Sequence, residues 1–292
     1  MFSYAQEIKE LATKVNESTR INIFAKTAKG RIPSQVSGEF ITNREQGDWA
    51  ETLMLKIINE KCEGLRGIKY GRVENLVAGD YGFKELFEKY QEEIAHLGKC
   101  PDLLIFKEED LSENVKKDIC SEKPRKDIIE IVRKAFAGIE VRSSAFLTKR
   151  YQEYRKSKET TNRDFLSFTP KIEDLVVIVR WIENHNIPHY YVQVLFDSMY
   201  IISFKKILEI LSDPDNNKVK YFIEQNYKNN FKGTIHINLN EGVCLSNDIK
   251  QPKHSSVRKE LINGRLVHFV KFEVDELPSD FEIDKFKKVL GI

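Results

Sequence analysis

The sequence predicts an α/β protein in which helices flank a mixed central β-sheet and a mainly helical region precedes it. Short apolar runs rich in Leu, Ile, Val and Tyr, such as residues 103–106 and 190–196, have the length and composition of buried strands. Segments with apolar residues at helical spacing lie on either side of these runs. The 292 residues, of which 41% are hydrophobic and 32% charged, suffice for a sizeable core.

Residues 1–80 form the predicted N-terminal region, and residues 81–292 form the predicted main domain. An amphipathic helix is expected over residues 4–16, where apolar side chains recur at helical spacing among Glu and Lys. Residues 23–43 mix basic, small and amide side chains around glycines and a proline, which indicates an exposed loop or ribbon.

A clear helix is expected to begin near Gln46, because Trp49 and Leu53 lead a stack of apolar side chains spaced four residues apart. Asp48 and Glu51 are spaced as a capping pair in the first turn of such a helix. This is one interpretation of Glu51, and a second one follows below.

The remaining elements follow from the same two periodicities. Two β-ribbon segments near the C-terminus, with a turn at Asn263-Gly264, are expected to extend the sheet, contact a second subunit or flank a ligand. Helices are expected at residues 83–97, 128–136, 145–158 and 204–211, strands at 99–106, 138–144, 175–179 and 190–196, and ribbon strands at 234–239 and 266–274.

Acidic residues lie on two of the predicted strands. Asp102 follows Pro101 at the start of one strand, and Glu140 lies 38 residues later on the next, sharing a face with Arg142 because strand side chains alternate. Carboxylate oxygens are the ligands that Mg²⁺ prefers. We therefore expect Asp102, Glu140 and the backbone carbonyl of Val141 to bind Mg²⁺.

This arrangement resembles the PD-(D/E)XK nuclease superfamily, and the stretch from Glu140 to Leu147 is especially similar to type II restriction endonucleases. The resemblance implies a restriction-endonuclease-like core in residues 81–292. It also implies an Mg²⁺-dependent, sequence-specific endonuclease that cuts double-stranded DNA and leaves 5′-phosphate ends. A repair or junction-resolving nuclease, or a DNA-binding protein without activity, are the alternatives. A palindromic target and a homodimer are expected, because one active site per chain must reach two symmetric phosphates.

The superfamily normally has lysine where this chain has Arg142. A guanidinium stays protonated, so it can stabilise phosphate charge but cannot accept a proton. Lys149, on the predicted helix that follows, is the other candidate for this cationic role. Many members of the superfamily also carry a glutamate on an early helix that reaches the metal, and Glu51 matches it. Whether Glu51 binds there or only caps its helix is open.

DNA-binding residues are expected in two places. The segment around Arg31, Ser34 and Gln35 has side chains that bond to phosphates and base edges, although an ordinary polar loop is an equal alternative. Between residues 142 and 163 basic residues exceed acidic ones by five, and this patch contributes Arg150, Arg155 and Arg163. Restriction enzymes that cut at CCGG have a related Arg-acid-Arg motif, but the spacing from Arg150 to Arg155 departs from it.

Other site classes are not indicated. The four cysteines form no CxxC pair, so neither zinc nor a disulfide framework is expected. No GxxxxGK[ST] loop is present, and His185 and His189 lack the context of a His-Asn-His nuclease. Without a membrane-length apolar run or a signal-peptide pattern, the expectation is a cytoplasmic protein that does not bind membranes.

Overall fold

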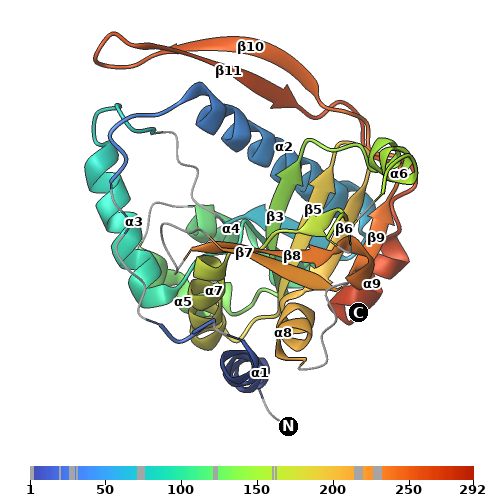
Figure 1. Cartoon of the computed structure of the whole chain (residues 1–292). Coiled ribbons are helices and arrows are strands. Elements are labelled where there is room, and N and C mark those ends of the chain that lie inside the picture. The colour runs from blue at the N-terminus through green and yellow to red at the C-terminus, as the bar shows by residue number, and fades with distance from the viewer. Residues whose placement is uncertain are drawn as a thin grey trace.

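A six-stranded sheet forms the centre of the molecule in the computed structural model (Figure 1). The structure describes residues 3–19, 21–25, 30, 32–70, 76–120, 124–159, 161, 163–213, 220–225 and 232–292. The sheet has the order β1-β2-β3-β5-β6-β9, and the pair β3–β5 is parallel whereas its other pairs are antiparallel. This confirms the predicted mixed sheet. The strands are β1 (Leu65–Lys69), β2 (Leu103–Lys107), β3 (Ala137–Ser144), β5 (His189–Leu195), β6 (Met199–Ser203) and β9 (Val243–Ser246).

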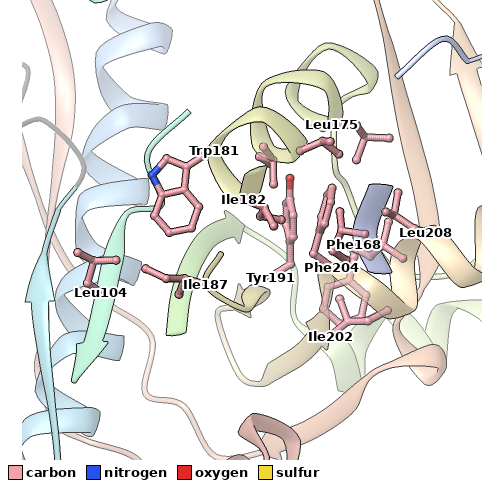
Figure 2. Close-up of a cluster of buried hydrophobic side chains, with 14 of the residues drawn as sticks. Leu104, Phe168, Leu175, Trp181, Ile182, Ile187, Tyr191, Ile202, Phe204 and Leu208 are labelled. Carbon is pink, nitrogen blue, oxygen red and sulfur yellow. The ribbon is translucent and has the colours of Figure 1, made fainter. Parts of the chain in front are cut away.

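Helices cover both faces of this sheet. One face packs against α2 (Gly38–Lys61) and α9 (Ile283–Leu290). The other packs against α1 (Tyr4–Ser18), α7 (Ile172–His185) and α8 (Phe204–Ser212). Figure 2 shows the second interface, where Trp181 and Ile182 of α7 approach Tyr191 of β5 and Leu104 of β2. Alternating strand side chains separate the two cores, so the inner strands β2 and β5 are buried on both sides.

Further elements surround these layers. A small sheet has the order β4-β8-β7, and an antiparallel ribbon, β10–β11, lies across the outer end of α2 (Figure 1). Their bounds are β4 (Ser167–Phe168), β7 (Tyr221–Gln225), β8 (Gly233–Asn238), β10 (Lys253–Glu260) and β11 (Leu266–Glu273). The remaining helices are α3 (Phe83–Leu97), η1 (Glu108–Asp110), α4 (Glu113–Cys120), η2 (Arg125–Ile128), α5 (Ile129–Val132), α6 (Thr148–Lys156) and η3 (Leu239–Glu241). The predicted C-terminal ribbon segments are confirmed as β8 and β11.

Helix α2 begins eight residues earlier than predicted. Ser37 is its N-cap, since the Ser37 side chain accepts a hydrogen bond from the Phe40 amide at 3.1 Å. Asp48 and Glu51 are therefore interior residues, and the capping interpretation of Glu51 is wrong. The sequence signal for this first part is weak because Gly47 has low helix propensity, and because the segment around residue 40 packs on the ribbon instead of the central sheet.

The strand predicted at residues 175–179 is wrong, because these residues lie inside α7. Their run of Val, Ile and Leu favours a strand by local propensity. All five side chains are buried in the helix, which packs between the sheet and neighbouring helices, so burial on every side outweighs that propensity. Asp174 lies in its first turn, and Asn186 ends it in the left-handed conformation, with φ 57°.

Helix α6 is shorter than the predicted helix at 145–158, and its inward side differs. Phe146 precedes the helix and Tyr154 lies on its outer side, and both are exposed, although helical spacing predicts that these two apolar side chains face the core. Strand β1 and helix α2 pack within the central layers, while the domain boundary at residue 80 stays a prediction.

Within the described ranges, no helix is long and apolar enough to cross a lipid bilayer.

Candidate active site

The two strand carboxylates lie opposite each other. The antiparallel register pairs Leu103 with Ile139 and Leu104 with Gly138, and one further step brings Asp102 opposite Glu140. The backbone N–H of Val141 donates a hydrogen bond of 2.7 Å to Oδ2 of Asp102. The structure thus brings together the two acids that the sequence placed 38 residues apart.

The segment that carries Asp102 is fixed on both sides. The Asp102 carbonyl accepts a hydrogen bond from the Tyr70 amide at 2.8 Å, and the Lys99 amide donates to the Val177 carbonyl of α7 at 3.0 Å. Gly98 ends α3 with φ 87°, and a Cβ there would lie 2.3 Å from the Trp181 amide nitrogen. Only glycine fits this conformation and this close approach to α7.

A quartet of charged side chains, defined here as Lys99, Glu140, Arg142 and Asp174, fills the face of β3 that points toward α7. Glu140 is only 1% exposed, and its Oε1 contacts both the Lys99 ammonium and the Arg142 guanidinium, the latter at 2.8 Å. Oδ2 of Asp174 lies 2.5 Å from Arg142 and 3.3 Å from Lys99. Two acids and two cations therefore neutralise one another in a largely buried site.

Lys99 and Asp174 were not among the residues that the sequence singled out. Lys99 lies just three residues before Asp102, and that proximity was an available signal. The sequence does not point to Asp174, because the run at residues 175–179 favours a strand. In the structure Asp174 lies in the first turn of a helix that faces β3.

The pKa values of the carboxyl groups show that they interact. Burial, together with the negative charges of Glu140 and Glu51, raises the pKa of Asp102 well above its ordinary value. Burial also raises the pKa of Glu140, but the Lys99 and Arg142 cations outweigh it and hold that pKa below the ordinary value. Asp102 is therefore the acid whose negative charge is least compensated by the chain itself.

Glu51 reaches this site from the opposite layer. Its carboxylate lies 3.3 Å from the Lys69 ammonium at the end of β1. Burial raises the pKa of Glu51, and the charges of Asp48 and Glu140 add to that effect against the opposing charge of Lys69. Glu51 and Glu140 both act electrostatically on Asp102, and Glu140 also acts on Glu51.

Several buried polar atoms on the same face of the sheet have no hydrogen-bond partner among the described residues. They are Oε2 of Glu140, Nε of Arg142, the Tyr191 hydroxyl and both amide atoms of Gln193. The register pairs Arg142 with Gln193 across β3 and β5, which places these groups side by side. Although Gln193 lies on a buried apolar strand, it is therefore not a core amide with satisfied hydrogen bonds. Unpaired buried polar atoms are unfavourable, so this site is suited to an additional polar ligand.

The residues present fit a divalent cation. No group of three or more His, Cys, Asp or Glu side chains in the described ranges could hold a metal ion by itself. Mg²⁺ nevertheless needs only one or two protein carboxylates, since it retains several waters. The unpaired Oε2 of Glu140 and the poorly compensated carboxyl of Asp102 are hard oxygen donors of the required kind.

The other predicted site residues lie further out. Lys149 is exposed at the start of α6, where its backbone amide donates to Asp197 at 3.2 Å. Arg150 is exposed on the same helix, Arg155 is partly buried there, and the Arg163 guanidinium lies 5.6 Å from the centre of the Phe222 ring.

The N-terminal DNA-binding candidates lie beside the β10–β11 ribbon. Ser34 and Gln35 are exposed, and the Gln35 side chain accepts a hydrogen bond from Arg265 at 2.9 Å. Arg31 lies outside the described residues.

A separate cavity of about 490 Å³ lies at the far end of the β1–β2 pair, lined by residues that include Leu65 and Lys107. The carboxylates lie at the opposite end of these strands, next to Lys69 and Leu103. The cavity is therefore not part of the charged site.

Comparison with known proteins gives one family. The family model described as AccI restriction endonuclease matches residues 2–161 and 154–292, which together span nearly the whole chain. Neither the curated proteins nor the solved structures contain a match.

Proposed function

Since the chain belongs to the AccI restriction endonuclease family, and is therefore a type II, sequence-specific DNA endonuclease, we propose that its hydrolytic centre lies at Asp102 and Glu140. The observation that carries this proposal is their cross-strand pairing beside the Val141 amide. Two acids from adjacent strands, one of them poorly compensated, form a site for a cation and an anionic substrate. Enzymes of this family use a divalent metal, and Mg²⁺ is the ion we propose.

Asp102, Glu140 and the Val141 carbonyl would hold the ion. When bound, it would neutralise the phosphate and lower the pKa of the attacking water. In hydrolysis the water oxygen bonds to phosphorus, and the bond from phosphorus to the 3′ oxygen breaks with its electron pair. Water releases one proton to solvent and the leaving oxygen takes up another. The products are a 5′-phosphate and a 3′-hydroxyl.

The chain supplies positive charge and a further acid to this centre. Arg142 contacts Glu140 and would stabilise phosphate charge, because a guanidinium is a strong donor to phosphate oxygens. This proximity favours Arg142 over the exposed Lys149, the other candidate for the cationic role. Glu51 would complete the site from α2, because its charge acts on Asp102.

DNA would contact surfaces on either side of this centre. We propose Arg150, Arg155 and Arg163 for one side, and Ser34 and Gln35 for the other. Arg31, which lies outside the described residues, is a further proposed DNA contact. Positive and amide side chains of this kind bind phosphates and base edges. A palindromic target bound by a homodimer is part of the same proposal, because it places one centre at each strand.

Cleavage of long, unmethylated DNA of mixed sequence tests this proposal. Discrete fragments should appear with Mg²⁺ and not in chelator. Asp102→Ala should abolish cleavage but still bind a duplex carrying the mapped site when Ca²⁺ replaces Mg²⁺, as followed by fluorescence anisotropy. Asp248→Asn, which removes a solvent-exposed ion pair with Lys250, is the matched control and should cleave normally. Cleavage by Asp102→Ala at the wild-type rate would place the centre elsewhere.

A further inference from the structure

Lys99 and Arg142 share one oxygen of Glu140 and one oxygen of Asp174, but they differ in which of the two acids is closer. Arg142 lies 2.5 Å from Asp174, closer than its 2.8 Å distance to Glu140. Lys99 contacts Glu140 directly and lies 3.3 Å from Asp174. Asp174 thus holds mainly Arg142, whereas the Lys99 ammonium is mainly a partner of Glu140.

The two cations also differ in how they are attached to the site. Lys99 belongs to the short segment that ends in Asp102, and that segment is anchored through the Lys99 amide and Gly98 on α7. The Lys99 and Asp102 charges act on each other. Its ammonium is therefore held between Glu140 and Asp174, on the segment that leads directly into Asp102. A single ammonium on a flexible stem can rotate from a carboxylate toward a phosphate oxygen.

We propose that Lys99 is a further catalytic residue, which donates hydrogen bonds to the scissile phosphate, while Arg142 is held by Asp174 as a clamp beside it. This inference rests on the proposed centre at Asp102 and Glu140. The ammonium remains protonated throughout, so it needs no proton acceptor and only stabilises negative charge that develops on the phosphate. Loss of such a preorganised donor typically reduces the rate by about 10²–10³-fold.

Lys99→Gln tests the proposal. The single-turnover cleavage rate at saturating enzyme should fall on the order of a hundredfold or more. Affinity for the duplex in Ca²⁺ should stay within about threefold of wild type, because DNA binding draws on many phosphate contacts. Added Ca²⁺ should still raise the thermal unfolding midpoint of Lys99→Gln, because the substitution leaves the carboxylates available to bind the ion. Lys99→Arg keeps the charge and should recover part of the lost rate.

Lys205→Gln is the matched control. Lys205 forms a lysine–glutamate ion pair with Glu7 between α8 and α1, at the opposite end of the molecule from the ribbon (Figure 1). Its cleavage rate should equal that of wild type. A similar loss in this variant would mean that loss of any ion pair between elements impairs the enzyme, and it would overturn the assignment to Lys99.

A double variant guards against misfolding of Lys99→Gln. Lys99→Gln with Asp174→Asn removes one cation and one acid, so the remaining pair of Glu140 and Arg142 stays neutral. The proposal requires the double variant to cleave on the order of a hundredfold more slowly than Asp174→Asn alone. Equal cleavage rates of the double variant and Asp174→Asn would overturn the proposal. It would also be overturned if weaker DNA binding in Ca²⁺ fully explained the rate loss of Lys99→Gln.

The same experiments separate this inference from the proposed centre. If Asp102→Ala is inactive while the Lys99 variants cleave normally, the centre stands and the role of Lys99 fails. If Asp102→Ala cleaves normally, the centre itself is wrong.

Discussion

Glu140 is a fully buried acid that stays ionised because two cations surround it. Lys99 and Arg142 contact the same oxygen, and their charges lower its pKa against the effect of burial. Removing either cation would leave an uncompensated buried charge. Such a change commonly lowers the free energy of unfolding by about 3 kcal/mol. At the scale of single residues, the contacts proposed to serve catalysis therefore also affect stability.

Arg142 and Lys149 should differ sharply when each is replaced by alanine. Arg142→Ala removes the contacts with Glu140 and Asp174, so cleavage should slow on the order of a hundredfold while binding survives. Lys149→Ala, at an exposed position, should change the rate only slightly. Single-turnover rates of both variants check this. A large loss in Lys149→Ala and a small one in Arg142→Ala would move the cationic role to α6.

His189 should make the protein less stable in mild acid. Burial lowers its pKa to about 4, compared with an ordinary value of about 6.5. The unfolded chain therefore binds a proton that the folded chain rejects. The contribution of His189 to the free energy of unfolding is complete above pH 6.5 and is lost as the pH falls toward 4. The total loss is roughly 3 kcal/mol, since each pKa unit corresponds to about 1.4 kcal/mol.

His189→Phe isolates this effect. The ring at 189 lies among Trp181, Tyr191 and Phe204, so phenylalanine suits its surroundings. Urea unfolding between pH 4 and 7 should give a shallower loss of the free energy of unfolding in this variant than in wild type. Parallel pH curves for the two proteins would rule out His189 as the cause.

At the scale of elements, α2 joins two parts of the molecule. Its C-terminal half packs on the central sheet through residues such as Leu53 and Ile57. Its N-terminal half supports the β10–β11 ribbon, where Ile41 of α2 packs with Val267 of β11. Glu51 lies between these halves, so the position of its carboxylate depends on a helix fixed at both ends.

Alanine substitutions at two glycines of α2 should change the free energy of unfolding in opposite directions. At Gly47 an added Cβ meets nothing within 4 Å, so Gly47→Ala should raise the free energy of unfolding by about 1 kcal/mol through helix propensity. At Gly38 a Cβ would lie 2.0 Å from the His268 carbonyl oxygen. Gly38→Ala should therefore push the ribbon from α2 and cost roughly 1–3 kcal/mol. Urea denaturation measures both, and equal effects would contradict the packing described here.

At the scale of the whole molecule, the proposed homodimer would follow from the symmetry of a palindromic target. A palindromic duplex has two equivalent scissile phosphates, and a chain with one centre reaches both only as a pair. The N-terminal helix α1 already buries Ile8, Ala12 and Val15 against its own chain. The β10–β11 ribbon is far more exposed, with Ile262 of its connecting turn 69% exposed. Of the two, the ribbon is the better candidate for a subunit contact.

Sedimentation of the protein with a short duplex carrying the mapped site should give two chains per duplex. Cleavage at low protein concentration should then rise more steeply than in proportion to protein concentration. One chain per duplex, with a rate strictly first-order in protein, would contradict the homodimer. It would indicate an asymmetric target or sequential nicking of the two strands.

The sequence by itself determined the mixed sheet, the two acid-bearing strands, most helices and the nature of the chemistry. The strands and helices follow from local periodicity. The nature of the chemistry follows from the family resemblance carried by Pro101-Asp102 before β2 and by Glu140 and Arg142 on β3. Local patterns show which side of a segment is apolar. The apolar patterns of the two segments that carry the acids clearly indicate strands.

Only the tertiary structure decided which side chains meet across layers. Asp174 joins Arg142 and Lys99 because residues 175–179 are helical. These five residues are helical because all of them are buried against surrounding elements, a condition that local propensity does not report. Lys99 reaches Glu140 because Gly98 turns the chain tightly against α7. Contacts between segments distant in the chain depend on packing, and packing is a property of the whole fold.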